Sequence, residues 1–372
     1  MSTEPLISVV IPSYRTDRST GTYHGTLRSW SRLETSGYEG DPGLRRLRLS
    51  LASLERQTVG KEHFEVVLVD DGGDYDLAEE SARWDLDLPL RVLRRPHAGL
   101  CHAFNHGVEQ ARAELVLLGL DHAVFAPDTL RAHLEAYRAA SRDRPGTRWA
   151  GCGRQRQLFH SVLFKDPTSS EVDPAHLAAL GRHEGLGWLP EATRYLGLDR
   201  KPITLDDARG GFAKLEYLSS RTPEYADLDA VLARGAHTLR CGWLTMRFGN
   251  HSLPKSLWEE LGGLDAGFDD HRGWYADLDL GLRLHRAGAE FGFVSSAVTL
   301  DLFHGGARGA ATAKSTGLVS MVNKHPLPEV LLLPHYLDQI GLTIADYEEH
   351  VTAADRWWTK GGSRRPTGAV PA

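Results

Sequence analysis

Cysteine is scarce in this sequence, which has only Cys101, Cys152 and Cys241 in 372 residues. The number is odd and no two of the three lie close together, so the pattern argues against a disulfide framework and against a zinc ribbon. We therefore expect free thiols and a reducing, cytoplasmic environment. No stretch resembles a signal peptide, because the start Met-Ser-Thr-Glu is polar and a strand-like run begins at Leu6.

Long apolar runs and an excess of positive charge are also missing. The longest apolar stretches, such as 115–118, fall far short of the roughly 20 residues that a membrane helix needs. The formal net charge is −6, so the composition gives no indication of nucleic-acid binding. With 41% hydrophobic and 25% charged residues, the chain is expected to fold as a globular enzyme with no integral membrane segment.

Strands and helices alternate through the first third of the chain. Residues 7–11 form a β-branched run that ends at Pro12, which is typical of a buried parallel strand. The further predicted strands are 64–69, 90–93 and 114–118, and the predicted helices are 44–57, 100–113 and 130–139. This alternation predicts an α/β fold with a mostly parallel, Rossmann-like sheet flanked by helices, whose ligands lie at the carboxyl ends of the strands.

The second half of the sequence is less regular. We interpret residues 155–240 as an insertion or a substrate-facing segment. The patterns predict strands at 241–248, 291–294 and 298–300, and helices at 254–261 and 277–287, the latter ending at Gly288. The last residues, from about 360 to 372, are rich in Gly, Pro and Arg and are expected to be disordered.

Polar side chains follow two of the predicted strands. Asp70 and Asp71 end the strand 64–69, where a carboxylate can accept the imide N–H of a base or meet a ribose hydroxyl, although a solvated turn explains the pair equally well. Asp121 and His122 follow the strand 114–118, where either side chain can hold a divalent cation. Taken alone, a loop with one solvated carboxylate explains this second pair better.

Two further candidates come late in the chain. Asp277 and Asp279 begin a predicted helix, and two residues correspond to roughly 200° of helical rotation, so only one of them can face a substrate. The other is expected to cap or pair, which we assign to Asp279. His304 follows a predicted strand and is a candidate metal ligand, with a hydrogen-bonded surface histidine as the simpler explanation.

Taken in order, the motifs of the chain resemble glycosyltransferase family 2. The resemblance covers most of 6–140 and 241–305. Its segments are Ser8-Val-Val-Ile-Pro-Ser-Tyr14, Leu51-Ala-Ser-Leu-Glu-Arg-Gln-Thr58, Val67-Leu-Val-Asp-Asp-Gly72, Ala98-Gly-Leu-Cys-His-Ala-Phe-Asn-His-Gly107, the strand that leads into Asp121, Gly249-Asn-His-Ser-Leu-Pro-Lys255, Leu261-Gly-Gly-Leu-Asp265 and Trp274-Tyr-Ala-Asp-Leu-Asp-Leu-Gly-Leu-Arg283. Each segment is weak alone, and their order and spacing carry the signal.

The resemblance implies a GT-A fold with a nucleotide-diphosphate sugar as donor, a UDP-sugar in first place, and an unknown acceptor hydroxyl. It implies an inverting transfer in which Asp277 is the general base and Mn²⁺ or Mg²⁺ lies on the diphosphate. The donor-binding residues implied are Pro12, Tyr14, Arg15, Asp70, Asp71, Gly99, Asn105, Leu120 and Asp121. The implied parts are a nucleotide-sugar-binding half (1–130), an acceptor-binding and catalytic half (131–310) and a helical C-terminal extension (311–372).

The sequence departs from the family pattern in three places. The usual D-x-D metal motif is reduced to Leu120-Asp121-His122, so either Asp121 or His122 is the near ligand and His304 the distal one. Ala276 stands where an acidic residue commonly precedes the base. Residues 15–45 form an insertion that is either a lid or acceptor contact, or a simple surface loop. The alternatives are a non-catalytic nucleotide- or glycan-binding module and a nucleotidyltransferase, although the latter lacks its Gly-rich loop after Pro12.

Overall fold

The computed structural model describes residues 4–15, 42–158, 203–219, 221–302, 310–339 and 341–360. Most of the insertion at 15–45, the segment 159–202, His304 and the tail beyond 360 therefore lie outside the described residues. No helix in the described ranges is both long and apolar enough to cross a membrane.

One eight-stranded sheet forms the centre of the molecule, in the order β3-β2-β1-β4-β7-β6-β8-β5. Its strands are β1 (Ile7–Ser13), β2 (Phe64–Asp70), β3 (Leu90–Arg94), β4 (Leu115–Leu118), β5 (Ala123–Phe125), β6 (Trp149–Gln157), β7 (His251–Pro254) and β8 (Glu290–Asp301). The pairs β3–β2, β2–β1, β1–β4 and β6–β8 are parallel, whereas β4–β7, β7–β6 and β8–β5 are antiparallel. The predicted α/β fold with a mostly parallel sheet is confirmed.

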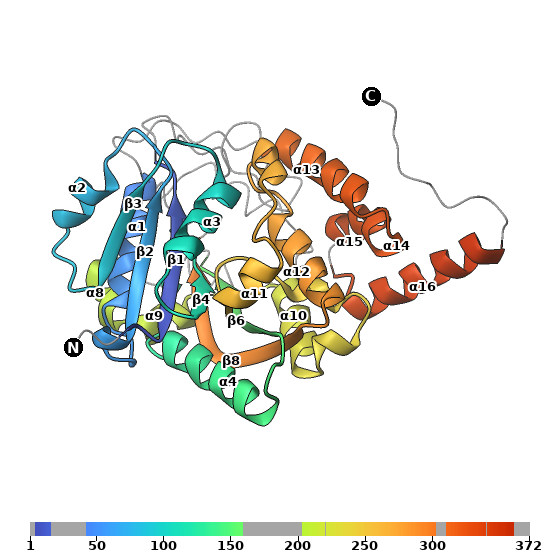
Figure 1. Cartoon of the computed structure of the whole chain (residues 1–372), viewed down its shortest axis with the longest axis horizontal. Helices are drawn as coiled ribbons and strands as arrows, with labels where there is room; N and C mark the ends of the chain where they lie inside the picture. The colour runs from blue at the N-terminus through green and yellow to red at the C-terminus, as the bar shows by residue number, and fades with distance from the viewer. Residues whose placement is uncertain are drawn as a thin grey trace.

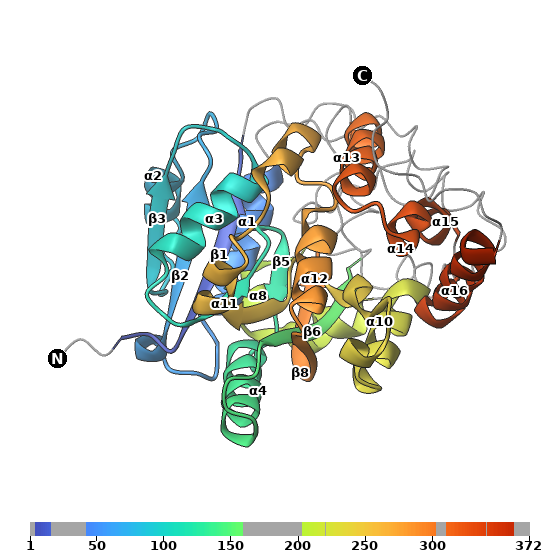
Figure 2. The same cartoon turned by 45° about the vertical axis from the view of Figure 1, so that its right-hand side comes forward.

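Helices cover the sheet on both sides. The apolar side chains of β1 therefore alternate between two hydrophobic cores, one on each face. Val10 packs with α3 (Leu100–Gln110) in one core, while Val9 and Ile11 pack with α1 (Pro42–Leu54) and α4 (Thr129–Asp143) in the other. In Figures 1 and 2 the parallel strands β1 to β3 lie at the opposite side of the molecule from the last helices. Between them lie α10 (Pro223–Ala233), α11 (Lys255–Glu260) and α12 (Ala276–Arg286), whereas α8 (Leu205–Gly210) packs against α1 and is followed by α9 (Phe212–Tyr217).

The C-terminal extension is helical, as expected. It consists of α13 (Ala310–Lys324), α14 (Pro328–Leu331), α15 (Leu333–Asp338) and α16 (Ile344–Lys360). The remaining regular elements are α2 (Leu77–Ala82) and four 3-10 helices, η2 (Lys61–His63), η3 (Ala236–Thr238), η4 (Gly242–Thr245) and η5 (Ala266–His271).

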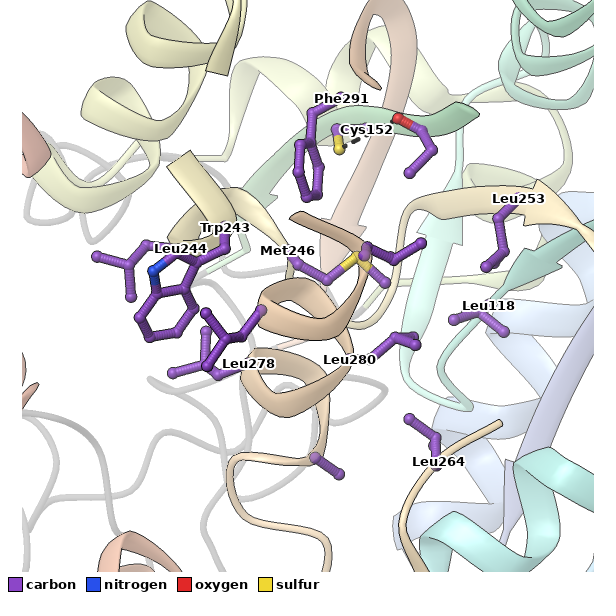
Figure 3. Close-up of a cluster of buried hydrophobic side chains, with 14 of the residues drawn as sticks. Leu118, Cys152, Trp243, Leu244, Met246, Leu253, Leu264, Leu278, Leu280 and Phe291 are labelled. Carbon is purple, nitrogen blue, oxygen red and sulfur yellow. Dashed lines mark hydrogen bonds between the residues drawn. The ribbon is translucent and has the colours of Figure 1, made fainter. Parts of the chain in front are cut away.

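Several details differ from the sequence prediction, and the short strands β5 and β7 were not predicted. The strand expected at 241–248 is wrong, because Trp243 and Leu244 form η4 and pack against α12 (Figure 3), and a short apolar run does not distinguish a buried helix from a strand. The two strands expected at 291–294 and 298–300 are one continuous strand, β8, which passes a bulge in its pairing with β6. Strand β6 escaped prediction, since its Gly- and Arg-containing sequence lacks strand periodicity.

Candidate functional site

The carboxyl ends of β1, β2 and β4 bring the predicted donor-side residues to one edge of the sheet. These strands are parallel neighbours, so the residues that follow them emerge together. Ser13 donates a hydrogen bond from Oγ to Asp121 Oδ2 at 2.7 Å, and Arg15 forms an ion pair with the same carboxylate. The structure therefore joins the ends of β1 and β4 through Asp121, which is 7% exposed.

His122 stands between two carboxylates. Its Nδ1 lies 3.0 Å from Asp121 Oδ1, and its Nε2 lies 3.5 Å from Asp301 Oδ1 at the end of β8. Burial lowers the pKa of His122 to about 4, so the imidazole is neutral near pH 7, which is the state that binds metals. Burial also raises the pKa of Asp301.

Within the described ranges, no group of three or more His, Cys, Asp or Glu residues is arranged to hold a metal ion. His304, the predicted distal ligand, is outside those ranges. Leu120 lies beside Asp121, and its carbonyl accepts a hydrogen bond from Ser50 Oγ at 3.2 Å.

Asp70 and Asp71 end β2 as predicted, but both carboxylates are buried, at 1% and 3% exposure. Asp70 accepts hydrogen bonds from the backbone N–H groups of Gly72 (3.1 Å) and Leu77 (3.3 Å). Asp71 accepts from four donors: Arg95 Nη1, His97 Nδ1, and the backbone N–H groups of Ala98 and Gly99. The acidic pair thus holds together the loops that follow β2 and β3.

Tyr14 is the exposed aromatic side chain of this edge, at 45% exposure, whereas Pro12 is buried within β1. The Tyr14 ring stacks on the His97 ring, with 4.0 Å between centroids and 22° between planes. His97 was not among the predicted site residues, and no local pattern marks it, because its two partners come from the ends of β1 and β2.

Gly99 precedes α3 and Asn105 lies within it, and both have mainly structural contacts. Gly99 has φ +111°, and a Cβ at this position would collide with Asp269, whose carboxylate accepts from the backbone N–H groups of Cys101 (2.7 Å) and His102 (3.0 Å). Asn105 exchanges two hydrogen bonds of 2.8 Å with the backbone of Leu264. These contacts fix α3 against the segment that leads to α12.

Asp277 lies in the first turn of α12, where backbone N–H groups favour an anion. Tyr275 precedes it in a left-handed conformation (φ +71°), and Asp277 Oδ1 accepts from the N–H of Leu278 at 2.9 Å. The carboxylate is partly buried, and this burial raises its pKa, although the nearby Arg247 guanidinium and backbone N–H groups act in the opposite direction. The result is a carboxylate that binds protons more strongly than an ordinary aspartate.

Asp279 has a different environment, with its side chain fully buried. It forms ion pairs of 2.8 Å with Arg283, Lys324 and His325, of which the last two are at the junction of α13 with the following loop. Burial alone would raise the pKa of Asp279, but the hydrogen bond from His325 and the two cations lower it overall. Asp279 pairs, as expected, and the role of Asp277 toward a substrate stays a prediction.

Gln157, at the end of β6, donates a hydrogen bond to Asp301 Oδ2 at 3.1 Å. Sequence reasoning missed Gln157 and Asp301 because they carry no motif and come from separate strands.

The chain is similar in sequence to known glycosyltransferases. Residues 44–168 match the family Glycosyl transferase family 2. The chain is 26% identical over 288 residues to validoxylamine A glucosyltransferase of Streptomyces hygroscopicus subsp. limoneus (76% of this chain, 49% of that protein). It is 25% identical over 251 residues to the uncharacterized glycosyltransferase YfnE of Bacillus subtilis (66% and 58%).

The chain spans about half the length of these curated relatives. Among solved structures, the mannosyltransferase PcManGT from Pyrobaculum calidifontis, in complex with GDP-Man and Mn²⁺, is 16% identical, with a TM-score of 0.43 over 98% of this chain and 77% of that one. A score of this size carries no argument about the site.

Proposed function

We propose that this chain, whose residues 44–168 match glycosyl transferase family 2, transfers a sugar from a nucleotide-diphosphate sugar to an acceptor hydroxyl, with inversion at the anomeric carbon. The observation that carries this proposal is the environment of the Asp277 carboxylate. Of the two carboxylates that begin α12, it is the one without an ion-pair network, and its raised pKa suits a general base.

In the proposed reaction, Asp277 accepts the proton of the acceptor hydroxyl. The acceptor oxygen forms a bond with the anomeric carbon from the face opposite to the leaving group. The bond between that carbon and the diphosphate oxygen breaks, and the electron pair leaves with the nucleoside diphosphate. General-base assistance of this kind is worth about 10²–10⁴-fold in rate.

Arg15 and the strand-end residues are proposed to bind the donor. Arg15 belongs to the edge that holds Asp121, and a guanidinium is well matched to phosphate oxygens. Tyr14 supplies an exposed aromatic ring for the base, and a UDP-sugar is the donor that we favour. Gly99, Asn105, Asp70 and Asp71 are proposed to support this site by fixing the loops around it.

A divalent cation, Mn²⁺ or Mg²⁺, is part of the proposal. The ligand types suit such an ion, because a carboxylate oxygen of Asp121 and an imidazole nitrogen of His122 meet at the end of β4, although the described residues bring no third ligand to them. Asp121 or His122 would hold it, with His304 as the distal ligand. When bound, the cation would neutralise charge on the departing diphosphate.

We propose a cytoplasmic location, because the three cysteines are buried and form no disulfide. The proposed acceptor is a compound with a free hydroxyl group.

A panel of UDP-, GDP- and TDP-sugars tests the proposal, with Mn²⁺ or Mg²⁺ present and nucleotide release as the readout. We expect slow hydrolysis or a thermal shift with at least one donor, and the anomeric configuration of the released sugar by NMR to be inverted. Absence of both responses with every donor would overturn the proposal. Binding without any release, even with an acceptor library, would indicate a non-catalytic nucleotide-binding module.

A further inference from the structure

The backbone that leads into α12, which we call the entry turn (272–275), is strained. Arg272 (φ +58°) and Tyr275 (φ +71°) have left-handed conformations, as does Gly273 (φ +74°). A residue with a Cβ rarely adopts this conformation, and it persists only where the surrounding structure holds it. Because Asp277 lies two residues after the turn, the place of its carboxylate depends on what holds the turn.

Helix α13 of the C-terminal extension packs against the segment that contains this turn (Figures 1 and 2). The approach is closest at Gly317. A Cβ at this position would lie 3.1 Å from the carbonyl oxygen of Trp274 and 3.2 Å from the Cβ atoms of His271 and Trp274. A glycine within a helix is less favourable than an alanine, so this close contact gives a physical reason for a glycine here.

Two hydroxyl groups of α13 hold His271, which directly precedes the turn. Thr316 Oγ1 lies 2.9 Å from His271 Nδ1, and Ser320 Oγ lies 2.7 Å from Nε2. A hydroxyl can donate or accept, so both hydrogen bonds form whichever ring nitrogen carries the proton. Residues three and four apart lie side by side on a helix, so both hydroxyls share one face of α13 with Gly317.

The end of α13 holds the chain on the other side of the turn. Lys324 Nζ lies 2.6 Å from Asp265 Oδ2 and 2.8 Å from Asp279 Oδ1. His325 Nε2 lies 2.8 Å from the same oxygen of Asp279. Contacts with α13 and the residue that follows it therefore bracket Asp277, before the entry turn and in the first turn of α12.

We infer that α13 is a positioning element for the proposed base, in which Gly317, Thr316 and Ser320 hold the entry turn. Through the turn, these residues set the place of the Asp277 carboxylate. The inference rests on the proposed function, since it gives α13 a role in the transfer step. A misplacement of about 1 Å can lower the rate of a chemical step by about 10²-fold. Donor binding at the strand-end edge is formed by other elements and should be unaffected.

The first test adds volume at the closest contact. In Gly317→Ala the neighbouring atoms must give by a few tenths of an ångström, and we expect a kcat about fivefold lower than wild type. The larger side chain of Gly317→Val should lower kcat by about 10²-fold. In both variants the KM for the donor and the calorimetric affinity for the matching UDP, GDP or TDP should stay within about twofold of wild type.

Nucleotide release from the donor that the panel identifies gives kcat and KM. The matched control is Gly210→Ala, because Gly210 is also the last part of a helix, α8, and a Cβ there meets open space. Its kcat should stay within about twofold of wild type.

The second test removes the hydroxyl groups without adding volume. Thr316→Val/Ser320→Ala loses both hydrogen bonds to His271, and we expect kcat to fall about tenfold at an unchanged KM. Thr316→Ser/Ser320→Thr keeps both hydroxyls and should retain most of the wild-type kcat, a rescue that reports on the hydrogen bonds. Hydrogen exchange gives a readout apart from activity. The amides of 271–281 should exchange faster in the first double variant and at the wild-type rate in the second.

The outcomes separate the two proposals. If wild type neither binds nor turns over any sugar nucleotide, the proposed function fails and the inference fails with it. If wild type is active but folded Gly317→Val keeps its kcat, or loses donor affinity as much as kcat, α13 does not position the base and the proposed function stands. If Gly317→Val does not fold, the hydroxyl variants decide. Equal kcat values and equal exchange rates in the two double variants would overturn the inference.

Discussion

Two acidic pairs of this chain look alike in sequence and differ in the structure. Asp70 and Asp71 end β2, and Asp277 and Asp279 begin α12. In the first pair both carboxylates are buried and engaged by loop donors. In the second pair Asp279 is engaged by the cations of Arg283 and Lys324 and by a hydrogen bond with His325, while Asp277 accepts from the Leu278 N–H and lies in the field of Arg247.

The comparison shows that the number of hydrogen-bond donors and cations around a carboxylate, and not the motif itself, determines whether it can accept a substrate proton. A family motif marks where carboxylates gather. Counting hydrogen bonds then separates those that hold the fold from the one that can accept a substrate proton. The following substitutions test this division.

The largest loss of stability is expected for Asp279→Asn. The change leaves Arg283, Lys324 and His325 without their buried counter-charge, and breaking a buried network of this kind costs about 3 kcal/mol. The free energy of unfolding from urea denaturation measures it. Asp265→Asn is the matched control, because Asp265 pairs with the same Lys324 at the surface, and it should change stability far less. Equal losses of unfolding free energy in the two variants would mean that the buried Asp279 network stabilises the fold no more than the surface ion pair of Asp265.

A smaller loss is expected for Asp71→Asn. An amide cannot accept from all four of the donors that now converge on the carboxylate, and an unsatisfied buried donor costs about 1–3 kcal/mol. Urea denaturation again provides the number, with the exposed Asp87→Asn as control. Wild-type stability in Asp71→Asn would contradict the structural role given to this residue.

Asp277→Asn should change stability in the opposite direction. Burial raises the pKa of Asp277 in the folded state, so folding is favoured by the protonated form below the unfolded-state pKa, and this contribution is lost as pH rises through the folded-state pKa. Near neutral pH the asparagine variant should therefore have a slightly higher melting temperature than wild type. The gain should vanish at pH values where Asp277 is protonated in both states. A lower melting temperature at pH 7 would show that the ionised carboxylate stabilises the fold.

The sequence predicted those parts of the fold and the site that local patterns determine. The apolar runs of β1, β2 and β4 and the helical spacing of α3 and α12 are local, and so is the rotation that separates Asp277 from Asp279. The sequence of strand β6 has no strand periodicity. The strand forms because of its long parallel pairing with β8, which the local sequence does not reveal.

The missed site residues share a physical cause. His97 meets Asp71 across 26 positions, and Asp269 caps α3 across 167 or more. Gln157 meets Asp301 across 144 positions. Such contacts depend on tertiary packing and leave no periodicity in the sequence, so the engagement of Asp71 became visible only once its donors could be counted.

The central claim is that Asp277 acts as the base while the other carboxylates hold the site. The most direct test measures sugar transfer and donor binding in the same Asp277→Asn preparation, after the donor panel has identified a substrate. The account predicts that transfer falls by about 10²–10⁴-fold, while the calorimetric affinity for the donor stays at the wild-type value. Retained transfer, or loss of donor binding in the folded variant, would contradict it.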